Sequence, residues 1–337
     1  MKLLICTQAV DKNHSNLGSF HRWLEEFAKH CESVSVVCLE EGAHTLPPNV
    51  TVWSAGKERG VSRPMRWVRI LRHLIRVRHE HDAVFVHMNP EYVVLGGLLW
   101  RLWGKRIGLW YTHKSVTLKL RLAVRFANII FTASKESFRI SSPKVRVTGH
   151  GIDTGLFVPG VRPAQLRVVT AGRISPTKRL REMLSALDVL AARGIDFDFT
   201  IAGAPIFPED ERYLKEIEEE ILRRPYASAV HCIGPVPYAR MPETLVRASV
   251  FLNLSQTGSV DRAVLEAASC GVVPVTTNDA FRQVLSPYGV YVGEDTPQHI
   301  AEALLKAQQV DPAPLMHYVR EQHSLSTLIP RLIAYVS

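Results

Sequence analysis

The chain of 337 residues, 46% of them hydrophobic, is long enough for two domains with ample cores. Its five cysteines are scattered and lack Cys-x-x-Cys spacing, which excludes the common zinc and redox motifs and favours a reducing cytoplasm. The net charge of +9 lies in the first half: residues 1–160 carry 23 Lys and Arg against 12 Asp and Glu, whereas residues 161–337 carry 18 against 20. We therefore expect an anionic partner for the first half, such as a membrane surface or a phosphate-bearing acceptor. Nucleic acid is not expected, because the basic residues lack interleaved stacking aromatics and any recognised module.

The sequence predicts neither a signal peptide nor a membrane span. Residues 1–8 turn polar after one short strand. The longest apolar run, 92–103, contains Arg101 and is shorter than the ~20 residues that a span requires. We expect a cytoplasmic protein, either soluble or peripheral on the inner face of the membrane.

Strands and helices alternate in both halves, which predicts α/β domains with parallel sheets covered by helices on both faces. The expected strands of the first half are 3–7, 34–39, 50–54, 83–87, 107–112, 129–133 and 145–148. Those of the second half are 168–171, 197–202, 229–233, 250–254, 272–276 and 290–292. The Pro- and Gly-containing segment 158–163 is typical of a linker. We therefore expect two Rossmann-like domains, 1–160 and 161–322, followed by a helix within 323–337.

Polar residues directly after the first-half strands are candidate substrate contacts. The loop 9–18 ends in Gly18, and its lack of Gly-x-Gly-x-x-Gly argues against a dinucleotide cofactor. After later strands come Asn89, Tyr92, His113 and Lys114. A structural role stays open for these residues, since Pro90 suits a turn before a helix and His113 is placed to cap one.

The segment 63–79 is a strongly basic amphipathic helix. One side carries Arg66, Arg69, Arg72, His73, Arg76 and His79. The other side carries Trp67, Val68, Ile70, Leu71, Leu74, Ile75 and Val77, and is expected to pack on the first domain's sheet. The row Arg66, Arg69, Arg72 and Arg76 is either a solvated face or a contact with anionic lipid, which contributes about 1 kcal/mol per residue near a membrane surface.

In the second half, a strand runs directly into Gly172, Arg173 and Lys178. Gly172 lets the backbone approach a ligand closely, and the two cations supply a guanidinium fork and a point charge suited to a diphosphate. Pro176 and Thr177 suit a helix start, whose free amides also favour anions.

The segment 257–275 combines a polar loop, an apolar helix that carries Glu266, and a following strand. It follows the strand 250–254, and open α/β sheets bind ligands at the carboxyl ends of their strands. Glu266 is therefore a candidate site residue. Asp261 either supplies a further carboxylate to the ligand or caps the helix through the amide of Val264.

Two metal-like patterns are set aside, and no protein-bound metal is expected. Asp196 and Asp198 open their strand, at the end opposite to ligand sites in such sheets. His79 and His81 are two residues apart and so face different ways on a helix.

These segments resemble the nucleotide-sugar-dependent retaining glycosyltransferases of family 4, which have the two-domain GT-B fold, and the resemblance covers nearly the whole chain. In that family a Gly-Arg-x-x-x-x-Lys element binds the donor diphosphate, which implies this role for Arg173 and Lys178. The glutamate that heads Glu-Ala-x-Ala-x-Gly-x-Pro-Val binds the donor ribose, which implies this role for Glu266. The segment 149–153 resembles the Asn-Gly-Val-Asp element and adds Asp153. The family's second glutamate, eight residues before the first, is replaced here by Gly258.

The resemblance implies a metal-independent, retaining hexosyltransferase that needs no cofactor beyond its nucleotide-diphosphate sugar, and a glycan or lipid-linked acceptor in cell-envelope or capsular polysaccharide synthesis. The first domain would hold the acceptor and receive the returning terminal helix. Catalysis would involve Arg173, Lys178 and His113. The donor-binding set is Gly18, Gly172, Arg173, Lys178, Val236, Gly258, Ser259, Asp261 and Glu266, and the acceptor-side set is Asn89, Tyr92, His113, Lys114 and Asp153. A nucleotide-sugar epimerase or hydrolase, or a non-catalytic nucleotide-sugar-binding protein, stays open as an alternative, the last because of Gly258.

Overall fold

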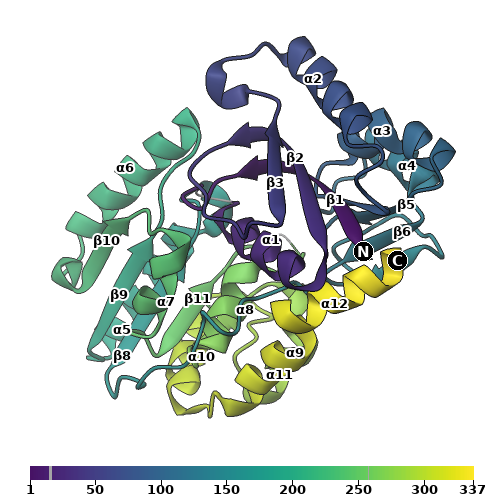
Figure 1. Ribbon diagram of the computed structural model, residues 1–337. Coiled ribbons are helices and arrows are strands. Elements are labelled where there is room, and N and C mark those ends of the chain that lie inside the picture. The colour runs from purple at the N-terminus through teal and green to yellow at the C-terminus, as the bar shows by residue number, and fades with distance from the viewer. Residues whose placement is uncertain (15–16, 257) are drawn as a thin grey trace. The chain divides into compact units, whose positions relative to one another are not determined.

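The computed structural model describes residues 1–14, 17–256 and 258–337. The chain divides into two compact units: unit 1 comprises Met1–Asp153 and His323–Ser337, and unit 2 comprises Thr154–Gln322. Each unit is built on one parallel sheet covered by helices (Figure 1), which confirms the expected α/β fold class. The first unit ends at Asp153 instead of residue 160, and the final segment belongs to that unit.

Unit 1 contains a seven-stranded sheet in the order β3-β2-β1-β4-β5-β6-β7. Its strands are β1 (Lys2–Val10), β2 (Ser33–Glu41), β3 (Val50–Ser54), β4 (Ala83–His87), β5 (Arg106–Trp110), β6 (Ile129–Thr132) and β7 (Val145–Val147). Its helices are α1 (Gly18–His30), α2 (Arg63–Arg76), α3 (Pro90–Leu102), α4 (Leu118–Phe126) and α12 (Leu325–Val336). The strand order reverses between β1 and β4, so ligands are expected beside the carboxyl ends of these strands.

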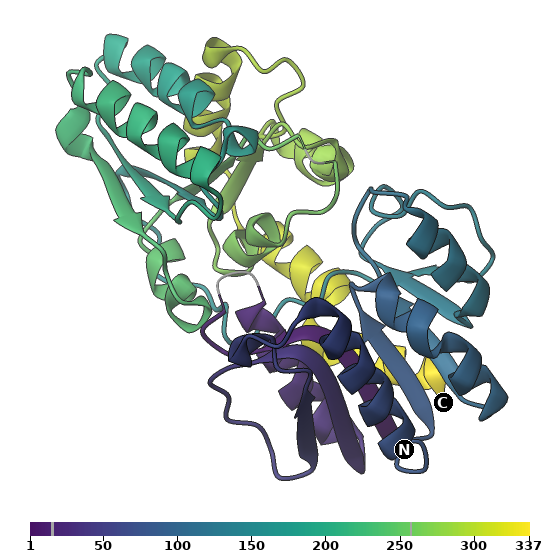
Figure 2. The same cartoon turned by 90° about the horizontal axis from the view of Figure 1, so that it is seen from above.

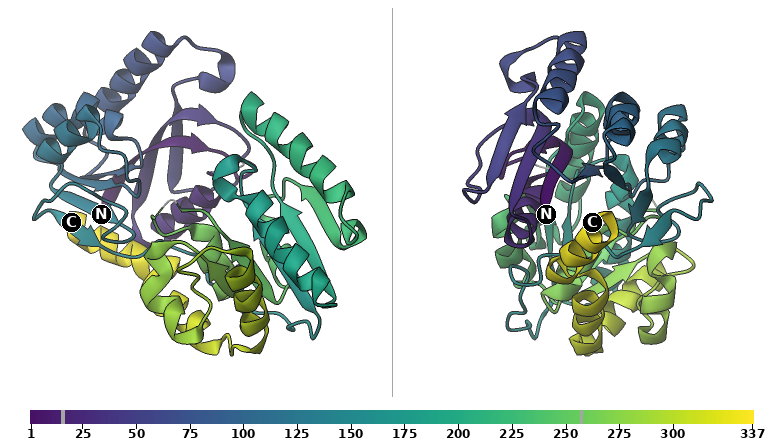
Figure 3. Two further views of the ribbon diagram at one scale, coloured as in Figure 1. Left: turned by 180° about the vertical axis from the view of Figure 1, so that it is seen from behind. Right: turned by 45° about the vertical axis from the view of Figure 1, so that its right-hand side comes forward.

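Two apolar layers cover the two faces of this sheet. On one face, α1 and α12 lie side by side (Figure 3) and bury Trp23, Phe27 and Leu328. On the other face, α2, α3 and α4 bury Leu74, Trp100 and other apolar residues. The terminal helix therefore completes the core of unit 1, because without α12 one face of the sheet would expose its apolar side chains.

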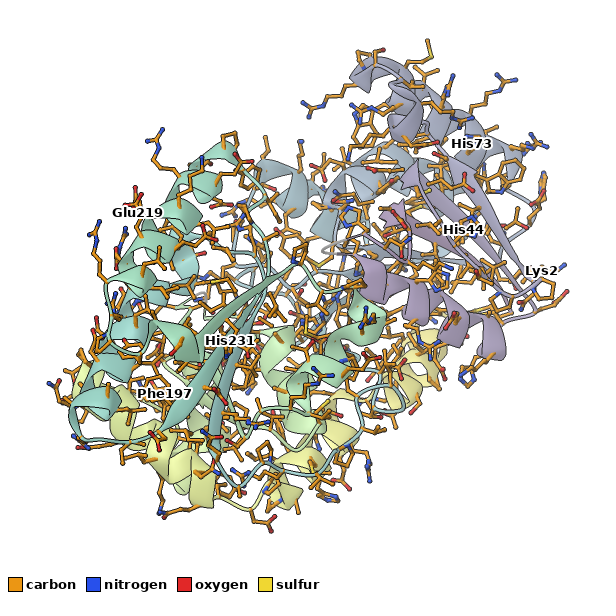
Figure 4. All side chains as sticks on the ribbon, turned by 90° about the vertical axis from the view of Figure 1, so that its left-hand side faces the viewer. Lys2, His44, His73, Phe197, Glu219 and His231 are labelled. Atoms are coloured by element: carbon orange, nitrogen blue, oxygen red, sulfur yellow. The ribbon has the colours of Figure 1, made fainter. Side chains whose placement is uncertain are left out.

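Helix α2 buries a narrower stripe than its sequence predicts. Ile70, Leu74 and Val77 are buried, but Val68 is 59% and Ile75 is 43% exposed. The expectation that Val68 and Ile75 pack on the sheet is therefore wrong. On the same helix, the imidazole Nε2 of His73 (labelled in Figure 4) lies 3.3 Å from the backbone oxygen of Ser54.

Unit 2 contains a five-stranded sheet in the order β10-β9-β8-β11-β12. Its strands are β8 (Leu166–Ala171), β9 (Phe197–Ala202), β10 (Val230–Gly234), β11 (Val250–Asn253) and β12 (Val273–Thr276). Its helices are α5 (Leu180–Ala192), α6 (Pro208–Leu222), α7 (Met241–Leu245), α8 (Arg262–Ser269), α9 (Arg282–Leu285), α10 (Pro297–Gln309) and α11 (Ala313–His323). Helices α5 and α6 lie side by side (Figure 2).

The sixth strand expected in the second half does not form. Only Tyr291 of the segment 290–292 pairs, through an isolated bridge to Thr276. The apolar run 290–292 predicts a strand, but in the structure it makes only this bridge, to the edge strand β12. Across the described ranges, no helix is both long and apolar enough to cross a membrane.

Candidate functional site

The candidate site lies in unit 2, where the strand order reverses between β8 and β11. Polar groups follow the carboxyl ends of both strands: Gly172, Arg173 and Lys178 after β8, and Asn253 and Asp261 at and after the end of β11. In open parallel sheets this position forms the ligand-binding crevice.

Gly172 stands where the chain leaves β8 and approaches β9 closely. Its φ of 127° is one that residues with a side chain rarely adopt. A Cβ added to Gly203 would lie 1.9 Å from the oxygen of Gly172, so the backbones after β8 and β9 are in direct contact. A Cβ added to Gly172 would itself lie 3.1 Å from Cε of Lys178, which places the lysine chain over this glycine.

Lys178 is joined to Asp261 across the site. Its Nζ donates to Asp261 Oδ2 at 3.2 Å, and both side chains are only 18% exposed. The same carboxylate oxygen accepts from Asn253 Nδ2 at 2.8 Å and from Ser255 Oγ at 3.3 Å. The carboxylate thus holds the ammonium group beside Gly172.

Asp261 also caps α8. Its Oδ1 accepts from the amide of Ala263 at 3.1 Å, so the expected capping role is confirmed with Ala263 in place of Val264. Burial raises the pKa of Asp261, but the charge of Lys178 and these hydrogen bonds more than offset it and lower the pKa to about 2. Asp261 is therefore a carboxylate at neutral pH.

Arg173 turns toward α6 instead of Asp261. Its Nε lies 3.7 Å from Oδ2 of Asp210, and its guanidinium carbon is 5.4 Å from the centre of the Phe207 ring. The Arg173 side chain remains 35% exposed, while that of Asp210 is 4% exposed. The two cations next to Gly172 are thus anchored on opposite sides of it.

Glu266 is a buried carboxyl group in the middle of α8. It is 4% exposed, and Arg262 Nε lies 3.0 Å from its Oε1 without the alignment of a hydrogen bond. This Oε1 has no hydrogen-bond partner among the described residues. Burial, offset in part by the charge of Arg262 and a hydrogen bond from Tyr238, raises the pKa of Glu266 to about 7. At neutral pH such a carboxyl group can accept a hydrogen bond from a ligand hydroxyl.

The helix start expected at Pro176 is displaced. Pro176–Lys178 form a single 3-10 turn, and α5 begins at Leu180, after Arg179 at a left-handed φ of 58°. The amide of Leu180 already donates to the hydroxyl of Tyr213 at 3.0 Å. The expectation of a helix start at Pro176 and Thr177 is therefore wrong, and one amide at the actual helix start already has a partner within the unit.

Three further donor-side candidates are on loops of unit 2. Gly258 is buried and has a φ of 60°, a conformation that a glutamate at this position would adopt only with strain. The backbone oxygen of Ser259 accepts from Asn278 Nδ2 at 2.9 Å. Val236 is half-buried and follows β10. Thr257, next to Gly258, lies outside the described residues.

The acceptor-side candidates lie in unit 1, where one expectation fails. Tyr92 is fully buried and its hydroxyl donates to the backbone oxygen of Thr7 at 2.6 Å, so its side chain belongs to the core and cannot contact a substrate. Asn89 is half-buried and precedes α3 without capping it through its side chain. His113 is exposed, and its Nδ1 accepts from the amide of Ser115 at 3.1 Å.

Of the other unit 1 candidates, Gly18 has a backbone partner and Asp153 has an ion-pair partner. Lys114 is half-buried after β5. Gly18 opens α1 and its amide donates to the backbone oxygen of His14 at 2.9 Å. Asp153 accepts a hydrogen bond from Arg22 Nε at 2.7 Å within the unit.

Four residues of the unit 2 site were not predicted from the sequence. Asn253 and Tyr238 contact Asp261 and Glu266 respectively, and Asp210 and Phe207 hold Arg173. Asn253 ends a strand, and polar strand ends are a usable signal. Asp210 is the third residue of α6, which marks it only as a helix-start acid.

Residues 156–321, nearly all of unit 2, match the family model described as "Glycosyl transferases group 1". Unit 2 carries a group 1 glycosyltransferase domain. The match covers the carboxyl ends of β8 and β11 and therefore the whole set of unit 2 site residues.

Curated relatives align with about half of the chain. A phosphatidylinositol N-acetylglucosaminyltransferase subunit of Arabidopsis thaliana is 29% identical over 177 residues, which are 51% of this chain and 38% of that protein. The Homo sapiens protein of the same description is 24% identical over 203 residues, 58% of this chain and 40% of that protein. The chain spans about two fifths of the length of these relatives.

Solved structures match nearly the whole chain. HepE of Anabaena in complex with UDP superimposes with a TM-score of 0.78 at 17% identity, covering 99% of both chains. The trehalose-6-phosphate synthase OtsA gives a TM-score of 0.74 at 11% identity, covering 100% of this chain and 99% of that one. At these identities the likeness establishes the fold, which is the expected GT-B fold.

Proposed function

We propose that the chain is a retaining, metal-independent hexosyltransferase that uses a nucleotide-diphosphate sugar. The observation that carries this proposal is Glu266 Oε1, a buried oxygen without a hydrogen-bond partner among the described residues, in the same site as the Lys178–Asp261 pair. Because this carboxyl pairs with a single guanidinium, that of Arg262 at 3.0 Å, it keeps lone pairs that can accept a hydrogen bond from a ligand hydroxyl. The family-4 resemblance assigns that hydroxyl to the donor ribose.

The diphosphate would lie between the two anchored cations. Asp261 stays ionised and would repel a diphosphate, but Lys178 stands beside it and would bridge the two anions. Arg173 is partly exposed and supplies the second charge. Fixed cations of this kind stabilise the charge that develops on a leaving group, and the departing phosphate would take the acceptor proton on the face where the new bond forms.

The donor that we propose is a UDP-sugar, and the acceptor is a lipid-linked glycan or an anionic lipid of the cell envelope. UDP is bound in the HepE structure of the same fold, and the curated relatives are named for N-acetylglucosamine transfer to phosphatidylinositol. UDP-N-acetylglucosamine and phosphatidylinositol are therefore the first substrates to test. His113 and Lys114 remain acceptor-side candidates, with Asn89 and Asp153.

Peripheral attachment to the inner membrane face belongs to the same proposal. Along α2 and the turn after it, the outer stripe consists of Met65, Val68, Arg72, Ile75, Arg76 and, in the turn, His79, all of them exposed. Arg66 and Arg69 are half-buried, so the exposed arginines Arg72 and Arg76 would make the main lipid contacts. A stripe that mixes exposed arginines with exposed Val68 and Ile75 suits an anionic interface better than bulk water.

The decisive experiment is product analysis of the purified chain with UDP-sugars, with and without acceptor lipids. Transfer of sugar to the lipid, with the anomeric configuration kept, supports the proposal. Release of free sugar or an epimerised nucleotide sugar without acceptor would instead favour the hydrolase or epimerase. Tight UDP binding without turnover on any acceptor would favour the binding protein, in which Gly258 replaces the glutamate that the family uses.

A further inference from the structure

Unit 1 contains a small cavity whose lining shares no residue with the candidate site of unit 2. It is lined by Leu39, Arg63, Arg66, Trp67, Asn89 and Glu91. Its volume is about 190 Å³. Because a water molecule takes up roughly 30 Å³ of liquid and drug-sized ligands fill pockets of roughly 300–1,000 Å³, this space suits a headgroup or a single phosphorylated ring.

The cavity lies where unit 1 is expected to bind ligands. Leu39 is near the carboxyl end of β2 and Asn89 follows β4, and these two strands flank β1 at the reversal of strand order. Met88, directly before Asn89, has a φ of 63°, which is rare for a residue with a side chain. Backbone strain of this kind is concentrated at functional sites.

The charge of the cavity wall favours an anion. Arg63 is exposed and Arg66 is half-buried, and Arg66 Nε is buried without a hydrogen-bond partner among the described residues. The only carboxylate in the lining is Glu91, and its Oε1 accepts from Lys119 Nζ at 3.0 Å. The lining therefore carries two arginines and one carboxylate that Lys119 already pairs with, and guanidinium groups bind phosphate oxygens through charge-assisted hydrogen bonds.

The remaining walls suit a hydroxylated ring beside the phosphate. Asn89 is the N-cap residue of α3, but its side chain makes no capping hydrogen bond. The side-chain amide can therefore contact a ligand hydroxyl. Trp67 meets the buried Tyr92 edge-on at 6.1 Å between ring centres and forms an aromatic wall. A polar amide and an aromatic wall next to a cationic corner favour a sugar or polyol phosphate over inorganic phosphate alone.

We propose that this cavity binds the headgroup of the acceptor, a phosphate-bearing sugar or polyol, with Arg63 and Arg66 on the phosphate and Asn89 on a hydroxyl. The inference rests on the proposed glycosyl transfer, whose acceptor class it specifies. The headgroup belongs either to a membrane lipid or to a free sugar phosphate. Helix α2 carries both the cavity arginines and the exposed Val68 and Ile75, which makes a lipid headgroup the expected source.

The test is calorimetric titration of the whole chain with inorganic phosphate, glycerol 3-phosphate, inositol 1-phosphate and glucose 1-phosphate, with glucose and inositol as uncharged controls. We expect a sugar or polyol phosphate to bind more tightly than inorganic phosphate. Arg66→Gln and Arg63→Gln should each weaken it about 10-fold or more, the loss of one charge-assisted contact. The matched control is Arg121→Gln, which removes an exposed arginine from α4 and should leave binding unchanged.

The inference is overturned if Arg63→Gln and Arg66→Gln both bind the phosphates as tightly as the parent chain does. It is also overturned if no probe binds up to about 10 mM. Arg63 is exposed, so its variant keeps the test valid if Arg66→Gln fails to fold. UDP titrated in the same instrument separates the two proposals: without UDP binding by the parent chain the proposed function fails, whereas intact UDP binding without phosphate binding removes the acceptor site alone. Vesicles with and without phosphatidylinositol then distinguish a lipid source from a free one.

Discussion

Lys178 Nζ donates to Asp261 Oδ2 at 3.2 Å, so the cation assigned to the donor diphosphate is held by the residue that caps α8. The pair connects the 3-10 turn after β8 to the N-cap of α8, and both side chains are largely buried. The cation is thus oriented before any donor arrives, which lowers the ordering cost of binding.

Replacement of either cation beside Gly172 should weaken the donor specifically. Arg173→Ala and Lys178→Ala each remove a charge-assisted contact worth about 1.5–3 kcal/mol, hence about 10- to 150-fold in UDP affinity. Titration of UDP measures the effect. Arg167→Ala is the matched control, because Arg167 lies near the amino end of β8 and pairs with Asp198. Parental UDP affinity in both site variants would contradict the assignment.

The ionisation of Glu266 should make the stability of unit 2 pH-dependent. Its pKa is raised from 4.5 to about 7, so the folded state holds a proton that the unfolded state releases between these values. The contribution of Glu266 to the free energy of unfolding is fully present below about pH 4.5. It is lost as the pH rises through about 7, a change of about 3 kcal/mol. Urea unfolding of parent and Glu266→Gln at pH 5 and pH 8 measures it, and equal pH dependence in both proteins would refute it.

The same substitution should act on nucleotide binding. Glu266→Gln keeps the shape but loses the charge, so it should weaken UDP, whose ribose hydroxyls need an acceptor, and should flatten the pH dependence of UDP affinity between pH 6 and 8. Equal UDP affinities in parent and variant would assign Glu266 a purely structural role.

His81 predicts the opposite pH dependence in unit 1. It is 1% exposed, its Nδ1 lies 2.8 Å from the oxygen of Val77, and its buried Nε2 has no hydrogen-bond partner among the described residues. Burial lowers its pKa from 6.5 to about 4, so its contribution is present above pH 6.5 and is lost as the pH falls toward 4, by about 3 kcal/mol. Amide exchange resolved by peptide should show unit 1 loosening below pH 6 in the parent and less change in His81→Asn.

Tyr92→Phe should affect stability and leave acceptor use unchanged. The variant leaves the buried oxygen of Thr7 without the phenolic donor, which costs about 1–3 kcal/mol. Thermal unfolding and the acceptor KM measure the two effects. A raised KM with unchanged stability would restore Tyr92 to the acceptor-side set.

The strand positions could be predicted from the sequence because buried parallel strands are short apolar runs between helices. Twelve of the thirteen expected segments overlap a strand over most of their length, and β10 and β12 each begin one residue later than expected. The residues of the candidate site could be predicted where a motif names them, as for Lys178 and Glu266. Partners contributed by other segments were not: that Asp210 holds Arg173, or that Tyr92 points into the core, depends on packing between distant parts of the chain.

Attachment to a membrane should depend on the outer stripe of α2. Arg72→Gln with Arg76→Gln should weaken co-sedimentation with anionic vesicles about 30-fold, at about 1 kcal/mol for each arginine, and 1 M salt should remove most of this binding. Arg66→Gln with Arg69→Gln should have a smaller effect, because these side chains are half-buried. The double variant Val68→Ser with Ile75→Ser should reduce the vesicle binding that remains at 1 M salt, since both residues are exposed and apolar.

The control for this stripe is Arg223→Gln in unit 2, whose side chain is 74% exposed and far from α2 in sequence. It changes the net charge by one without touching the stripe, so it should sediment like the parent. Binding that ignores lipid charge and salt, or that falls equally in Arg223→Gln, would contradict a defined membrane face. The acceptor would then be a soluble phosphorylated glycan, and the cavity beside Arg66 would have to bind it without the help of a lipid surface.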